Sequence, residues 1–114
     1  MSETRWLCIC HYGHSRSVAL ARVLHGQKIP AVAAGWTSSG DALTTLSAWA
    51  DVVALMTPDG LAKIPPEHRH KVHDFNIGPD AWSNPYHPEL LAICRQKVAD
   101  FHRDHPQNPG APRP

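Results

Sequence analysis

The segment from residue 10 to residue 17 combines the residue types and the spacing that phosphate chemistry needs. It reads Cys-His-Tyr-Gly-His-Ser-Arg-Ser, so five residues separate Cys10 from Arg16, and Ser17 follows directly. A loop of that length can curl until its backbone N–H groups point inward, and such a nest binds a tetrahedral oxyanion. Arg16 would then grip two oxygens of the anion, because a guanidinium binds oxyanions in a bidentate manner.

Cys10 is the expected nucleophile of this loop. A helix N-terminus and neighbouring cations favour the thiolate form of a cysteine, and the thiolate is the form that attacks. A thiolate below a bound phosphate is aimed at phosphorus, so we expect a covalent phosphocysteine. Ser17, like Ser15, can donate a hydroxyl proton to the sulfur and ease its departure. Gly13 permits the tight backbone that the loop requires.

The elements that must hold this loop alternate between strand-like and helical patterns. Short apolar runs predict strands over residues 6–10, 31–35 and 51–56, and the half-polar run 72–77 predicts a fourth strand at an edge of the sheet. Helical patterns follow at residues 15–25, at 41–49, from Thr57-Pro58 to before Pro65-Pro66, and from Pro88 onward. Such alternation predicts βαβ units and a mostly parallel sheet. Ligands of these sheets bind beyond the carboxyl ends of the strands, which is where the Cys10 loop falls.

Length and composition exclude several other classes of protein. The chain has 114 residues, 42% of them hydrophobic and 18% charged, which is typical of one globular domain. We assign that domain to residues 1–105 and expect a disordered proline-rich tail over 106–114. A net charge of +1 argues against a nucleic-acid coat or a membrane surface. Without a signal-peptide pattern or a run long enough to span a membrane, we expect a cytoplasmic protein.

The loop resembles the signature of the cysteine-dependent protein tyrosine phosphatases. Its position on the first strand resembles the low-molecular-weight phosphatases and the related arsenate reductases, whereas Gly13 and Ser15-Arg16-Ser17 resemble the dual-specificity form of the loop. The resemblance covers roughly residues 6–104. It implies a phosphomonoesterase that acts on a phosphorylated protein or a small aryl phosphate, such as phosphotyrosine, and that needs no cofactor.

The expected architecture is an α/β three-layer sandwich. Its four-stranded parallel sheet has the strand order 2-1-3-4, and the phosphatase loop lies between the first strand and the first helix. Phosphate, vanadate or sulfate are the expected ligands of the loop. Neither nucleic acid nor membrane is an expected partner.

The general acid is expected on the loop after the fourth strand. In the low-molecular-weight family this acid is an Asp that precedes a Pro, but the sequence has Asn84-Pro85-Tyr86 at the nearest equivalent. Asp80 is the only carboxylate between residues 78 and 87, so it is the favoured acid. His87, Asp74, a water molecule, or no acid at all are the alternatives.

Aromatic and histidine side chains are candidates for substrate binding. Trp36 and Trp82 follow the second and fourth strands and, together with Tyr12, can wall a pocket for a phenyl phosphate; ordinary partial burial is the alternative. His11 and His14 flank the cradle and would help to bind a dianion when protonated, or they simply fill the loop.

A metal site is not expected, although the chain has nine histidines. The densest histidine run, His68, His70 and His73, has no cysteine or carboxylate at ligand spacing and is typical of a solvated loop that enters a strand.

Two other functions compete with phosphate ester hydrolysis. An arsenate reductase would use the same cradle but needs a resolving thiol, for which Cys8 and Cys94 are poor candidates because both are expected in the core. Oxidative pairing of Cys8 with Cys10 remains an alternative. The second competitor is a non-catalytic module that binds oxyanions or phosphopeptides, and the missing Asp-Pro supports it.

Overall fold

The structure is a computed structural model that describes residues 4–11, 15–37, 40–78, 82 and 84–105. Its strands are β1 (Trp6–Cys10), β2 (Ala31–Gly35), β3 (Val52–Leu55) and β4 (Val72–Asp74). Its helices are α1 (Arg16–Gly26), α2 (Gly40–Trp49), α3 (Pro88–Asp104) and two 3₁₀-helices, η1 (Pro58–Lys63) and η2 (Pro66–Lys71).

The described strands form a parallel sheet of order β2-β1-β3-β4, which confirms the predicted topology. In the centre of the sheet, Ile9 pairs with Ala34 on one side and with Leu55 on the other. All five residues of β1 are buried, since the strand has neighbours on both edges and helices on both faces. Parallel sheets require such covered faces, which explains why β1 reads as a continuous apolar run.

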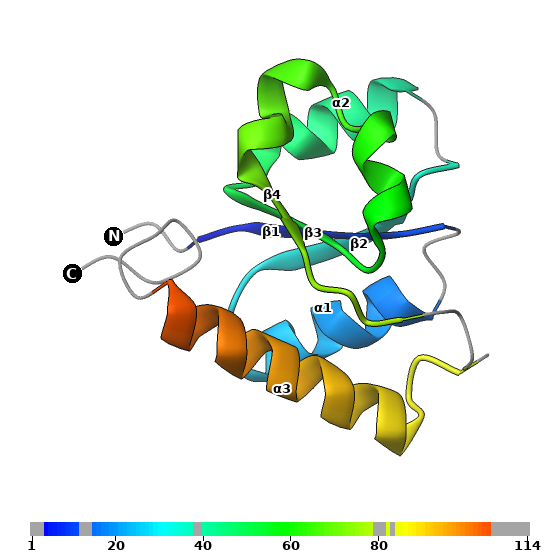
Figure 1. Cartoon of the computed structure of the whole chain (residues 1–114), viewed down its shortest axis with the longest axis vertical. Coiled ribbons are helices and arrows are strands. Elements are labelled where there is room, and N and C mark those ends of the chain that lie inside the picture. Colours follow the sequence, from blue (N-terminus) through cyan, green and yellow to red (C-terminus); the bar gives the residue numbers. More distant parts are fainter. Residues whose placement is uncertain (1–3, 12–14, 38–39, 79–81, 83, 106–114) are drawn as a thin grey trace.

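The sheet is the middle layer of the predicted three-layer sandwich. Helices α1 and α3 cover one face, and α2 with the two 3₁₀-helices covers the other (Figure 1). Successive side chains of β1 point to opposite faces of the sheet, so alternate residues pack against different helical layers. Trp6, Cys8 and Cys10 pack in the core beside α1 and α3. Leu7 and Ile9 pack in the core beside α2. Cys10 therefore ends β1 on the face that α1 covers.

The structure differs from the predicted elements in two places. Strand β4 ends at Asp74 instead of residue 77, because Asn76 adopts a φ of 47° that no strand continues. The Phe75 and Ile77 N–H groups still donate to β3 and to the residue after it. Residues 66–71, expected as a loop, form η2, which begins at Pro66; the proline ring restricts φ to values that suit the first turn of a helix.

Two further expectations concern the ends of the chain and its surroundings. The tail expected over residues 106–114 lies outside the described residues. Among the helices that the structure describes, none combines the length and the apolar character needed to cross a membrane.

Candidate active site

The Cys10 thiol and the Ser17 hydroxyl meet at the carboxyl end of β1. Sγ of Cys10 lies 3.1 Å from Oγ of Ser17, and either atom can be the donor. Cys10 is the last residue of β1 and is 3% exposed, while Ser17 is fully buried in the first turn of α1. When Cys10 is ionised, the hydroxyl is the donor, so this contact stabilises a thiolate.

The N-terminus of helix α1 lies at the same carboxyl end of β1, next to Cys10 and Ser17. The Ala19 N–H donates to the Ser15 carbonyl at 2.8 Å, which closes the first helical turn immediately after the loop. The first N–H groups of a helix have no acceptor within the helix, and the end carries a partial positive charge. No acidic residue lies in the first turn of α1 to offset that charge. The end of α1 therefore favours an anion next to Cys10.

Arg16 connects this helix end to the segment that follows β4. Its side chain is 5% exposed, and Nη1 donates to the carbonyl oxygen of Gly78 at 2.8 Å. Gly78 has a φ of +104°, a conformation in which a residue with a side chain would be strained. A guanidinium carries its five N–H donors in a rigid planar fork, so the bond to Gly78 fixes the orientation of the whole group.

The two tryptophans expected to wall the pocket lie in different layers. Trp36 packs against the core on the α2 side and stacks on His11, with ring centroids 5.0 Å apart. Trp82 packs against the core on the α1 and α3 side, and its Nε1 donates to Oε1 of Glu89 at 3.0 Å. Each ring is thus fixed by a contact of its own.

Four of the predicted site residues, Tyr12, Gly13, His14 and Asp80, lie outside the described residues. The two alternative acids are described. His87 is the N-cap of α3, where its Nδ1 accepts a hydrogen bond from the Glu89 N–H at 3.1 Å. Oδ1 of Asp74 accepts one from the Asn76 N–H at 2.9 Å. Both side chains therefore stabilise local backbone structure.

The two other cysteines are poor sources of a second thiolate. Burial raises the pKa of Cys8 far above its ordinary range, and the nearby Cys94 and Cys10 add to this effect. Burial likewise raises the pKa of Cys94, to about 12, although Arg95 opposes the shift. A resolving step that needs one of these thiols as a thiolate is disfavoured, which counts against arsenate reduction.

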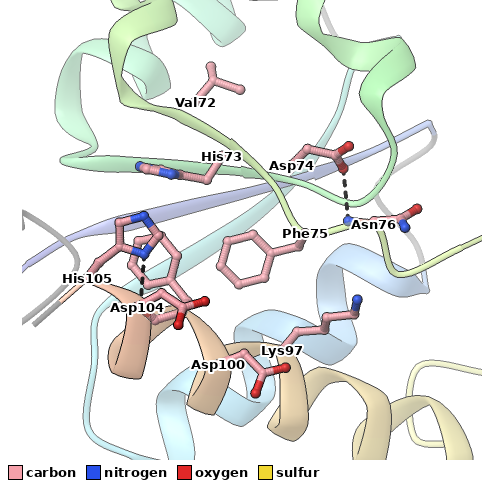
Figure 2. A pocket seen from close by; sticks show the side chains of 10 residues that line it. Val72, His73, Asp74, Phe75, Asn76, Lys97, Asp100, Asp104 and His105 are labelled. Atoms are coloured by element: carbon pink, nitrogen blue, oxygen red, sulfur yellow. Dashed lines mark hydrogen bonds between the residues drawn. The ribbon is translucent and has the colours of Figure 1, made fainter.

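A cleft of about 430 Å³ lies away from this site, between β4 and α3 (Figure 2). Phe75 and Phe101 stack in it, and Asp74, Lys97 and Asp100 lie along it. The cleft follows the side of β4 instead of the carboxyl end of the sheet. Within the described part of the chain, no three His, Cys, Asp or Glu side chains come close enough together to hold a metal ion.

Sequence reasoning missed three residues that shape the site. The carbonyl oxygen of Gly78 accepts the hydrogen bond from Arg16. The N–H and the Oγ1 of Thr37 both donate to the His11 carbonyl at 3.4 Å. Gly60 lies against the ring of Trp36. The Gly78-Pro79 dipeptide signals a turn, but nothing in it indicates a partner on α1. The other two contacts join segments whose meeting depends on the strand order.

Comparison with known proteins identifies the fold. No protein-family model and no curated protein matches the sequence. Among solved structures, Wzb from Vibrio vulnificus in complex with benzylphosphonate matches with a TM-score of 0.59 and 13% identity, over 90% of this chain and 99% of that one. A protein tyrosine phosphatase from Entamoeba histolytica matches with a TM-score of 0.61 and 12% identity, over 92% and 99%. The chain has the fold of the low-molecular-weight protein tyrosine phosphatases.

Proposed function

We propose that the protein is a cysteine-dependent phosphatase that hydrolyses phosphate monoesters, with phosphotyrosine or another aryl phosphate as substrate. The observation that carries the proposal is the 3.1 Å contact between the Cys10 thiol and the Ser17 hydroxyl, next to the N-terminus of α1. A buried nucleophile, a buried cation and a helix end at the carboxyl edge of a parallel sheet are what phosphoryl transfer to sulfur requires.

The first chemical step is attack of the Cys10 thiolate on phosphorus. The S–P bond forms as the bond between phosphorus and the ester oxygen breaks. Charge spreads over the three remaining oxygens, where the Arg16 guanidinium and the first N–H groups of α1 stabilise it. Because Arg16 is already oriented by its bond to Gly78, little reorganisation accompanies the reaction.

Asp80 is proposed to give the leaving oxygen its proton. It follows Gly78 by two residues in the sequence, and two residues of chain reach at most about 7 Å. Since Gly78 is bonded to Arg16, the short sequence distance between Gly78 and Asp80 supports this assignment. In the second step, the Asp80 carboxylate takes a proton from water, which attacks phosphorus. The S–P bond then breaks, and its electron pair returns to sulfur, where the Ser17 hydroxyl stabilises the thiolate.

The aromatic side chains support an aryl substrate. Trp36 and Trp82 flank the carboxyl edge from different layers, and His11 stacks on Trp36 directly after the nucleophile. A related fold offers a precedent, since Wzb was solved with benzylphosphonate, an aryl-bearing phosphonate. We assign Tyr12, Gly13, His14 and Ser15 to the substrate cradle on their positions in the loop.

The proposal is tested by comparing Cys10→Ser with Cys94→Ala. Cys10→Ser is expected to abolish hydrolysis of para-nitrophenyl phosphate and to retain binding of phosphate or vanadate, because the cradle and Arg16 remain. Cys94 lies in the core contributed by α3, so Cys94→Ala is expected to retain hydrolysis with a lower melting temperature. Turnover and calorimetric binding of vanadate are the two measurements.

Two results would contradict the proposal. Hydrolysis by Cys10→Ser at the parent rate would exclude a cysteine nucleophile. Binding of vanadate by a parent protein that hydrolyses no aryl phosphate would favour the non-catalytic binding module instead.

A further inference from the structure

A groove of about 260 Å³ lies between helices α1 and α3, and none of its residues belongs to the Cys10 site. Val23 is buried and Leu91 is half-buried, so the base of the groove is apolar. Arg22 of α1 and Arg95 of α3 line it as well, and both are exposed. The groove therefore combines an apolar base with one cation from each helix.

Carboxylates do not balance these two cations in the part of the chain that the structure describes. Helix α1 contains no acidic residue, and no ion pair between described residues involves Arg22 or Arg95. On α3, Glu89 accepts a hydrogen bond from an indole N–H, and Asp100 pairs with Arg103 at 3.1 Å. Two like charges that line one groove repel each other, so a bound anion would stabilise both.

The Arg22 side chain is held in place by an aromatic ring. Its guanidinium carbon lies 4.4 Å from the centroid of the Tyr86 ring, which is a cation–π contact. The Tyr86 N–H donates to Oδ1 of Asn84 at 2.9 Å, and this bond fixes the segment just before α3. Because the guanidinium is already positioned, binding of a ligand costs less side-chain entropy.

We propose that the groove between α1 and α3 is a docking site for an acidic segment of a partner protein. A carboxylate of that segment would lie between Arg22 and Arg95, since a guanidinium binds carboxylates through parallel N–H donors. An aliphatic side chain of the segment would cover Val23 and Leu91. A nucleic acid is a poorer match, because it needs a longer row of cations along its phosphates. The docking site goes beyond the proposed function and does not depend on it.

The test is fluorescence anisotropy of the labelled peptide Gly-Glu-Glu-Leu-Glu-Gly, which carries no phosphate. The parent protein is expected to bind it more tightly than the same peptide with glutamine in place of each glutamate. Arg22→Gln and Arg95→Gln should each raise the dissociation constant by about twofold to fivefold, which is the contribution of an exposed ion pair. The double variant should bind both peptides equally weakly.

Arg103→Gln is the matched control. It removes an arginine from the same helix, 69% exposed, that pairs with Asp100 and Asp104 instead of lining the groove. The change in net charge is the same, so the parent dissociation constant should be retained if the groove itself binds the peptide. Arg95→Gln keeps the test decisive if Arg22→Gln displaces the Tyr86 segment, because Arg95 makes no such contact with a ring of the described residues.

Saturating vanadate separates the groove from the Cys10 cradle, which also attracts anions, and peptide binding should not change when it is added. Displacement of the peptide by vanadate, equal binding of the glutamine peptide, or an equal loss in Arg103→Gln would each overturn the docking site. The same holds if the parent binds no peptide. Self-association in analytical ultracentrifugation that Arg95→Gln abolishes would also overturn it, because a second copy would then occupy the groove.

The peptide carries no ester, so this test separates the docking site from the proposed function. A parent protein that binds the peptide through both arginines and hydrolyses no aryl phosphate would retain the docking site and contradict the proposed enzyme. A parent that hydrolyses aryl phosphates and binds no acidic peptide would do the reverse.

Discussion

Two regions of the molecule gather polar side chains, and they do so in different ways. At the carboxyl end of β1, Cys10, Arg16 and Ser17 are at most 5% exposed. Along the cleft between β4 and α3, the carboxylates of Asp100 and Asp104 are exposed to solvent by 36% and 62% (Figure 2). The first region removes polar groups from water, and the second leaves them largely hydrated.

The difference shows that a cleft and a cluster of buried polar groups need not lie in the same place. Removing a thiol, a guanidinium and a hydroxyl from water costs free energy unless they are paired, so a buried cluster of this kind is a candidate for chemistry. The carboxylates of the cleft bond locally instead: Asp100 accepts from Gln96 at 2.9 Å and pairs with Arg103 at 3.1 Å. Exposed pairs of that kind contribute little to stability.

The largest expected difference between the two regions comes from their cations. Arg16→Lys keeps the charge but loses the bidentate fork and the fixed bond to Gly78, so kcat/KM for an aryl phosphate should fall by at least about a hundredfold. Lys97→Gln, which removes a cation from the cleft, should leave kcat/KM within about twofold. A loss below tenfold for Arg16→Lys would mean that charge alone suffices.

A smaller loss of rate is expected when a buried serine beside Cys10 is replaced, and a second buried serine elsewhere provides the comparison. Ser17→Ala removes the hydroxyl at 3.1 Å from Cys10, and a hydrogen bond to a charged group is worth about tenfold to a hundredfold in rate. We expect the loss in breakdown of the phosphocysteine, visible as a burst of para-nitrophenol in stopped-flow traces. Ser47 is also fully buried, but its hydroxyl has no partner among the described residues, so Ser47→Ala should show parent kinetics.

The absence of a burst in Ser17→Ala, with an unchanged steady-state rate, would contradict the role of the hydroxyl. An equal loss of rate in Ser47→Ala would instead assign the effect to packing.

The strand and helix pattern was sufficient to predict the frame of the site. Apolar runs of strand length and helical periodicity are local properties, so the end of β1 at Cys10 and the start of α1 at Arg16 follow from neighbouring residues. The strand order, in contrast, is predicted from the resemblance to the low-molecular-weight phosphatases. The local sequence pattern of β2 does not indicate which strand lies beside it. The solved structures with the same fold bear out that part of the prediction.

The contacts that complete the site were beyond sequence reasoning for a physical reason. The bond between Arg16 and Gly78 joins positions 62 residues apart, and the approach of Gly60 to Trp36 depends on two loops meeting after different strands. Periodicity carries no information on such pairs. The early end of β4 is similar, since it depends on the backbone conformation of Asn76, which the half-polar pattern of residues 72–77 does not indicate.

The smallest expected effect lies in the cleft and concerns stability instead of activity. Burial lowers the pKa of His73, and the nearby His105 adds to the shift. The folded state therefore binds fewer protons at this site than the unfolded state, whose pKa is near the ordinary 6.5. The contribution to stability is complete above pH 6.5 and is lost as the pH falls toward the pKa of the folded state.

His73→Gln tests this assignment, because it removes the titrating group and keeps a polar side chain beside Phe101, whose ring lies 4.8 Å from that of His73. Urea unfolding at pH 7.5, 6.5, 5.5 and 4.5 should show a smaller loss of unfolding free energy in the variant than in the parent. His70→Gln is the control, since that side chain is exposed on η2, and it should keep the parent slope. Both variants should retain parent kcat/KM at pH 7. A lower kcat/KM in His73→Gln alone would break the separation between the two regions, because the cleft would then act on the site at the end of β1.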